Sequence, residues 1–212
     1  MTEQRHLRTA IAAERQELAE LLWELEDHDW NAPSLCEGWR VHEVVAHITM
    51  AFRYSTGRFL RELVRAAGRF DRMADRCARR DAARHSPTEL TQVLADNTEH
   101  PWKPPGSGYE AALSHDVIHG LDITVALGLD RKVPAERLRY VLDGQTERSI
   151  RYFGVDLDGV ELRADDLDWT YGSGTPLHGA AQDLLLVQCG RLLPAGRLRG
   201  EPSPRFERSY AT

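Results

Sequence analysis

The sequence predicts an α+β protein that is mainly helical. Residues 1–153 are expected to form an antiparallel bundle of four or five helices, and residues 154–212 a small α/β domain. Two observations support this division. The first part repeats apolar residues at helical spacing, with glycine or proline between the segments. After Gly154 the pattern changes to alternating apolar and polar residues with turn signals, which is typical of short strands.

Composition excludes several classes of protein. The 212 residues include 33 acidic and 27 basic side chains, and the net charge of −6 argues against a nucleic-acid partner. Three cysteines without a C-x-x-C pair argue against a disulfide framework or a cysteine zinc site. No apolar run approaches the roughly 20 residues that span a bilayer, and the amino terminus is too polar for a signal peptide. We therefore expect a cytoplasmic protein without a membrane partner. Composition leaves nine histidines unexplained.

The first half of the predicted bundle contains two long helices. Leucine and isoleucine recur at helical spacing over residues 2–27, without an internal proline or glycine. A turn-rich loop with two tryptophans follows, and a second helix is expected over residues 41–67, with Gly68 ending it. Residues 69–85 are rich in arginine and aspartate and only weakly periodic, so we expect a solvated connection with some helix.

Capping signals define the remaining helices. Ser86, Pro87 and Glu89 form a capping box that starts a third helix, which runs to about His100. After a proline-rich break, residues 108–127 make a fourth helix and residues 134–153 a fifth. Beyond Gly154 we expect two short strands with glycine-containing turns, then a small helix over residues 180–187 and a basic tail.

Three histidines form a candidate metal site. His115 and His119 stand four residues apart, so their Cβ atoms lie about 5–6 Å apart on one face of the fourth helix. His47 sits inside VVAHITM, at the rim of an apolar helical stripe that points into a bundle. Such a pair can arise by chance, and a lone histidine like His47 is more often a satisfied core residue. Together the three would make a three-nitrogen site with an open position, the arrangement of catalytic zinc.

Three carboxylates lie near these histidines in the sequence. Asp122 follows His119 by three residues and could accept the distal N–H of a ligating ring, or be a surface carboxylate near a helix end. Glu43 and Asp116 are candidates for moving protons.

Three segments of the chain resemble a known family. PSLCEGWRVHEVVAHI, HDVIHGLDITVALG and LRADDLDWTYGSGTPLHGAAQDLLLVQCGRL resemble the mycothiol-dependent maleylpyruvate isomerase family, within the DinB-like metalloenzyme superfamily, almost end to end. The resemblance implies a DinB-like antiparallel four-helix bundle with a small C-terminal α/β domain. It also implies a divalent metal, usually zinc, that activates the thiol of mycothiol, with His47, His115 and His119 as its ligands.

The resemblance also bears on three further positions. Isomerases of the family tend to have glutamate where His115 stands, whereas an all-histidine set is common in related thiol transferases, so the isomerase reaction stays open. Arg191 matches the glycine-arginine of the C-terminal domain. It is implied to act in catalysis and cofactor binding by holding an anionic group of cofactor or substrate, or else it neutralises a helix dipole. Cys36 is expected to pack as a buried hydrophobe rather than to line the cleft.

The leading hypothesis is a metal-dependent enzyme that activates a low-molecular-weight thiol such as mycothiol for transfer to, or isomerisation of, a small electrophilic substrate. The alternatives are a hydrolase of a small ester, amide or lactone that uses zinc-bound water, and a non-enzymatic metal-binding protein. The oligomeric state, monomer or dimer, stays open. Four aromatic residues either set the substrate specificity or serve as core packing: Trp30, Trp39, Trp102 and Tyr109.

Overall fold

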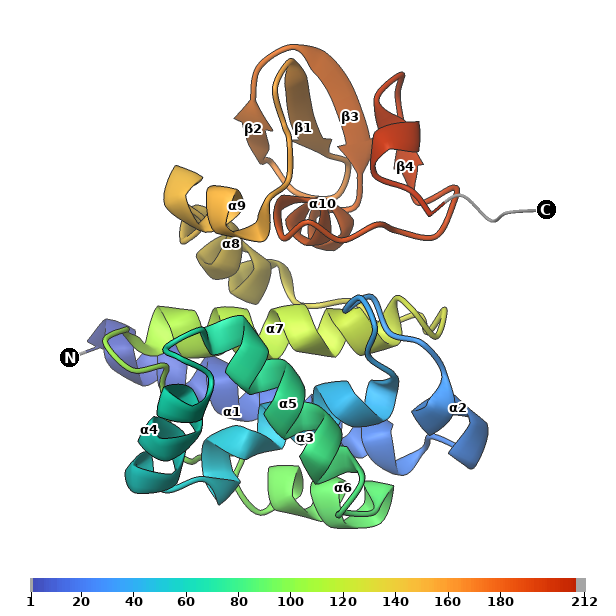
Figure 1. The fold of residues 1–212 in the computed structure, drawn as a ribbon. Helices are drawn as coiled ribbons and strands as arrows, with labels where there is room; N and C mark the ends of the chain where they lie inside the picture. Colours follow the sequence, from blue (N-terminus) through green and yellow to red (C-terminus); the bar gives the residue numbers. More distant parts are fainter. Residues whose placement is uncertain (1, 209–212) are drawn as a thin grey trace. The chain divides into compact units, whose positions relative to one another are not determined.

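The computed structural model describes residues 2–208 and divides into two compact units, Met1–Gly120 and Leu121–Thr212 (Figure 1). The first unit is helical and the second combines helices with a small sheet, which confirms the predicted fold class. The second unit begins before the boundary expected after residue 153, because two helices that precede the sheet lie in it. Among the described residues, no helix is both long and apolar enough to cross a membrane.

The first unit is built around α3, which packs against α5 and α6, while α1 packs against α6. Val44, Val45 and Ile48 of α3 are fully buried and form the apolar face that the sequence indicated. The helices of this unit are α1 (Thr2–Trp23), α2 (Asp27–Asn31), α3 (Val41–Arg53), α4 (Thr56–Arg65), α5 (Phe70–Ala82), α6 (Pro87–Ala95) and α7 (Tyr109–Thr124), the last of which continues into the second unit.

The expectation of a single helix over residues 41–67 is wrong, because the helix is interrupted at Tyr54 and Ser55. The Tyr54 backbone is extended, and the Ser55 hydroxyl accepts a hydrogen bond from the Arg58 amide at 3.2 Å, which starts α4 as an N-cap. No glycine or proline except Gly57 marks this break, and the hydrophobic period continues through it. The sequence therefore carried only the weak signal of one serine.

The expectation of a mostly solvated connection over residues 69–85 is also wrong. These residues form α5, which buries Met73, Cys77 and Ala78 in the first unit. The apolar stripe is narrow and made partly of alanine, so the many charged side chains on the rest of the helix hide its periodicity.

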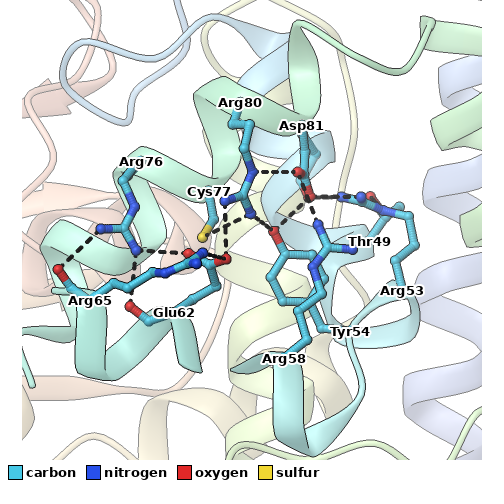
Figure 2. Close-up of polar contacts among 11 residues, drawn as sticks. Thr49, Arg53, Tyr54, Arg58, Glu62, Arg65, Arg76, Cys77, Arg80 and Asp81 are labelled. Atoms are coloured by element: carbon cyan, nitrogen blue, oxygen red, sulfur yellow. Dashed lines mark hydrogen bonds and ion pairs between the residues drawn. The ribbon is translucent and has the colours of Figure 1, made fainter. Parts of the chain in front are cut away.

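A buried polar network joins α3, α4 and α5 (Figure 2). The Asp81 carboxylate accepts hydrogen bonds from Arg53 at 2.7 Å and from the Tyr54 hydroxyl at 2.9 Å. Arg80 reaches Asp81 at 3.4 Å and Glu62 at 3.2 Å, so one guanidinium links both buried carboxylates. Arginine partners on several sides let these two acids stay ionised away from water.

The second unit contains a sheet in the order β2-β1-β3-β4. β1 and β3 are parallel, with Leu162 opposite Leu177, and the other two pairs are antiparallel. α10 packs against β1, β3 and α8. The elements are α8 (Ala135–Asp143), α9 (Glu147–Phe153), β1 (Val160–Ala164), β2 (Thr170–Gly172), β3 (Thr175–Gly179), α10 (Ala181–Gln188), β4 (Leu198–Arg199) and the 3-10 turn η1 (Ser203–Arg205).

Two expectations for this unit need correction. Four strands, not two, are present in the described residues. β3 contains Pro176 and Gly179, residue types that are depleted in strands, and β4 is only two residues long, so neither carried a clear strand signal. The single helix expected over residues 134–153 is two helices, since α8 ends at Gly144 and the Thr146 hydroxyl caps α9 by accepting from the Ser149 amide.

The buried network predicts a pH-dependent stability. Burial alone would raise the pKa of Asp81, but the hydrogen bonds and charge of Arg53 outweigh it and hold that pKa below its usual value. The stabilising contribution of Asp81 is therefore complete above the unfolded pKa of about 3.9 and is lost as the pH falls through the lower folded value. We expect Asp81→Asn to cost about 3–5 kcal/mol of unfolding free energy at neutral pH, because Arg53 stays buried without its partner.

Urea unfolding of wild type and Asp81→Asn across the acidic range measures this effect. The difference in unfolding free energy should be constant near neutrality and shrink below about pH 4. A difference that persists unchanged into strong acid would contradict the ion pair.

Candidate metal centre

The structure brings His47, His115 and His119 together in the first unit, and we call these three residues the histidine triad. His47 comes from α3 and is buried, while His115 and His119 come from successive turns of α7 and are partly exposed. One ring nitrogen of each lies within 4.8 Å of the others. The Nε2 atoms of His47 and His115 are 3.3 Å apart. One nitrogen of each ring in the triad therefore lies close enough to the others for the three to share one ion.

The donor set, and the spacing between two of its nitrogen atoms, fit a tetrahedral metal ion. Two nitrogens that each lie about 2.0–2.1 Å from one zinc ion are about 3.3–3.4 Å apart. The distance between the His47 and His115 nitrogens matches this value. Three neutral imidazoles suit zinc and other borderline divalent ions, and three protein ligands leave a coordination position for a further group.

Asp116 and Arg15 support His115 from the interior of the bundle. The Asp116 carboxylate accepts a hydrogen bond from His115 Nδ1 at 2.8 Å and another from Arg15 Nε at 2.7 Å. Burial alone would raise the pKa of Asp116, but the His115 hydrogen bond and the Arg15 charge outweigh it and hold that pKa below its usual range. Sequence reasoning considered Asp116 for moving protons and missed Arg15, which is 101 positions away along the chain.

Two tryptophans pack beside the triad. The centroid of the Trp39 ring lies 5.3 Å from that of His47, and the centroid of Trp102 lies 5.1 Å from that of His115. Trp39 is fixed by its indole N–H, which donates to Asp75 at 2.8 Å. These are two of the four aromatic residues singled out in the sequence, and they flank the rings of the histidine triad with apolar surface.

Cys36 lies closer to the triad than the sequence analysis expected. Its thiol is half-buried, and its sulfur is 3.8 Å from His119 Nδ1. The loop that contains Cys36 is closed by Ser34, whose amide and hydroxyl both donate to the Trp39 carbonyl at 2.9 Å. Cys36 is therefore not a fully buried hydrophobe, and its sulfur borders the candidate metal centre.

The Glu43 carboxylate is paired with Arg40. It accepts hydrogen bonds from the backbone and guanidinium of Arg40, at 2.9 and 2.6 Å, at the start of α3. Burial would raise the pKa of Glu43, but the Arg40 hydrogen bonds outweigh it and lower that pKa. This carboxylate holds the end of the helix that carries His47.

Arg191 lies in the second unit and forms a two-pronged ion pair with Asp122. Its Nε and Nη2 atoms donate to the two Asp122 oxygens at 2.8 and 3.0 Å, and Nη1 donates to the Cys189 carbonyl at 3.0 Å. Gly190 permits this geometry: its φ is +71°, and a Cβ there would lie 2.7 Å from the Phe153 carbonyl oxygen. Asp122 is fully buried, so it is not the surface carboxylate that the sequence left open.

A comparison with known protein families identifies one part of the chain. Residues 11–100 match the family model described as the mycothiol maleylpyruvate isomerase N-terminal domain. This segment belongs to that family. The match confirms the resemblance seen in the sequence motifs and includes His47, whereas His115 and His119 lie beyond the matched residues.

Two solved structures share the fold of the chain. A crystal structure of the mycothiol-dependent maleylpyruvate isomerase with a histidine-to-alanine mutation is 14% identical, with a TM-score of 0.59, over 94% of this chain and 93% of that one. A second crystal structure of a mycothiol-dependent maleylpyruvate isomerase is 13% identical, with a TM-score of 0.53 and the same coverage. A search of curated proteins finds no significant match.

The triad predicts a metal site that depends on each of its rings. We expect His47→Ala to weaken zinc binding by more than about 100-fold, because losing even a group behind a ligand costs about 10–100-fold. Competition with a chromogenic chelator measures this affinity. His42→Ala is the matched control on the same helix, since the His42 ring lies against the His85 carbonyl at 3.0 Å. Equal zinc affinity in the two variants would count against the site.

Proposed function

We propose that this protein is an enzyme that uses mycothiol. In this proposal His47, His115 and His119 hold a divalent metal ion, for which zinc is the best candidate. The observation that carries the proposal is the convergence of three imidazole nitrogens. It occurs in a chain whose N-terminal domain belongs to the mycothiol maleylpyruvate isomerase family. The substrate is a small electrophile, which either accepts the thiol or is isomerised by it. The free cysteines Cys36, Cys77 and Cys189 fit a reducing compartment such as the cytoplasm.

The all-nitrogen ligand set favours thiol transfer over the isomerisation for which the family is named. A bound zinc ion would supply positive charge that lowers the pKa of a coordinated thiol, and so makes its sulfur a better nucleophile. Three neutral imidazoles leave that charge undiminished, whereas the glutamate typical of the isomerases would remove part of it. His115 is thus the residue that separates the two reactions.

Three further residues are proposed to hold groups in place. Trp39 and Trp102 flank the rings with apolar surface, which lowers the local dielectric and strengthens charge interactions at the sulfur. Arg191 is proposed to bind an anionic group of the cofactor or substrate, since its guanidinium is held rigidly by Asp122. No cysteine of the protein is needed as the nucleophile.

A direct test mixes zinc-loaded protein, mycothiol and a small alkylating electrophile, and follows the loss of free thiol together with the formation of the thioether. We expect turnover that requires both zinc and mycothiol and is lost in His115→Ala. Maleylpyruvate tested in the same way should be isomerised more slowly than the alkylating substrate is consumed.

Two results would decide against this proposal. Hydrolysis of a small ester or lactone at the same rate with and without thiol would assign the site to zinc-bound water. Metal retention without turnover of any electrophile in the presence of mycothiol would make the protein a metal-binding protein.

The role of Arg191 predicts a change in KM. Lysine cannot keep the two-pronged contact with Asp122, so its ammonium group would lack the fixed position of the guanidinium. Arg191→Lys should therefore raise the KM for the anionic reactant by about tenfold or more, the scale of one charge-assisted hydrogen bond. Arg197→Lys is the matched control, because Arg197 donates two hydrogen bonds to the buried Asp183 in the same unit. A KM that rises equally in both variants would point to a general loss of structure.

A further inference from the structure

The ion pair between Arg15 and Asp116 is buried to a degree that stability does not explain. The Arg15 side chain is 0% exposed and the Asp116 side chain 2%. Removing two charges from water costs several kcal/mol for each, and an apolar pair of similar volume is often at least as stable. The pair is therefore informative about function, and its contacts show what it positions.

The first contact fixes the His115 ring. An ionised carboxylate can only accept hydrogen bonds, so the 2.8 Å contact with Asp116 Oδ1 requires the proton of His115 to be on Nδ1. The lone pair is then on Nε2, the atom that lies 3.3 Å from His47 Nε2. A carboxylate behind a metal-binding histidine acts in this way, by selecting the tautomer and the orientation of the ring.

The second contact fixes the carboxylate itself. Arg15 Nε donates to the other oxygen, Asp116 Oδ2, at 2.7 Å, so Asp116 is held from the side opposite His115. The guanidinium carbon of Arg15 also lies 4.9 Å from the centroid of the Phe52 ring, which is contributed by α3. Arg15 on α1 thus orders a carboxylate on α7 while it packs against α3.

The third contact holds the segment that precedes Trp102. Arg15 Nη1 donates to the backbone carbonyls of His100 at 2.8 Å and Thr98 at 3.4 Å. This segment leads directly to Trp102, whose ring packs against His115 at 5.1 Å between centroids. One arginine therefore restrains His115 from two sides, through the carboxylate and through the tryptophan segment.

From these contacts we infer that Asp116 and Arg15 are positioning residues that hold His115 in its Nδ1–H tautomer, with Nε2 directed to the metal. The inference rests on the proposed metal site. It adds the expectation that metal affinity depends on two residues that would not themselves bind the metal. Their effect acts through the His115 ring alone.

The first arm of the test uses the metal-free protein. Long-range ¹H–¹⁵N NMR correlations distinguish the two tautomers of each histidine, and a His115→Gln spectrum assigns the His115 signals. We expect His115 in wild type to carry its proton on Nδ1. A proton on Nε2 would overturn the inference, whatever the behaviour of the metal.

The second arm measures metal affinity. Asp116→Asn can turn its amide N–H toward His115 Nδ1 and so favour the wrong tautomer. We therefore expect zinc and cobalt affinity about 10–100-fold below wild type, with a changed cobalt absorption spectrum. Glu62→Gln is the matched control, because Glu62 is a buried carboxylate whose arginine partners Arg76 and Arg80 lie on α5. Its cobalt spectrum should stay that of wild type.

The outcomes separate this inference from the proposed function. Equal loss of affinity in Asp116→Asn and Glu62→Gln, or wild-type affinity in Asp116→Asn, would overturn the positioning role while the metal site stands. If wild type binds neither ion, the proposed function fails, and the metal-affinity part of this inference fails with it. The tautomer result then still shows whether Asp116 orients the His115 ring.

Discussion

The hydrogen bond between Asp116 and His115 is the interaction on which the candidate site depends. It joins the His115 ring on α7 to the buried guanidinium of Arg15 on α1. His47 on α3 meets the same ring from the other side. Three helices from distant parts of the sequence must therefore assemble before the three nitrogens converge, so the site is a property of the packed bundle and not of one motif.

The sequence predicted the triad but not its support. His115 and His119 were found because residues four apart share a helix face, a rule that needs no tertiary information. His47 stood out only through its place in an apolar stripe and through family motifs. Arg15 carried no signal, because in a charged amphipathic helix an arginine that turns inward looks the same as one in solvent. Cys36 was interpreted as core, since loop geometry decides whether a thiol borders a site.

In the fold, too, local sequence signals predicted some features, whereas features that depend on tertiary contacts were missed. The capping box located the start of α6, because that signal acts within one turn, and the predicted fourth helix includes all of α7. The end of α6 expected near His100 is wrong, since the helix ends at Ala95. The break between α3 and α4 and the burial of α5 were missed. In both cases long-range packing and the network around Asp81 and Glu62 contribute to the outcome, and the residues of α5 are mostly arginine, aspartate and alanine. A highly charged helix such as α5 can therefore pack against the core when its arginines pair with buried carboxylates.

The central claim is that three histidines hold the metal and that an external thiol completes its coordination. X-ray absorption at the zinc edge measures this directly, because nitrogen scatterers at about 2.0–2.1 Å and sulfur at about 2.3 Å are resolved from each other. The account predicts imidazole scattering without sulfur in the zinc-loaded protein, and one zinc–sulfur distance that appears when mycothiol is added. A sulfur scatterer already present without thiol and lost in Cys36→Ala, or no sulfur at saturating mycothiol, would contradict it.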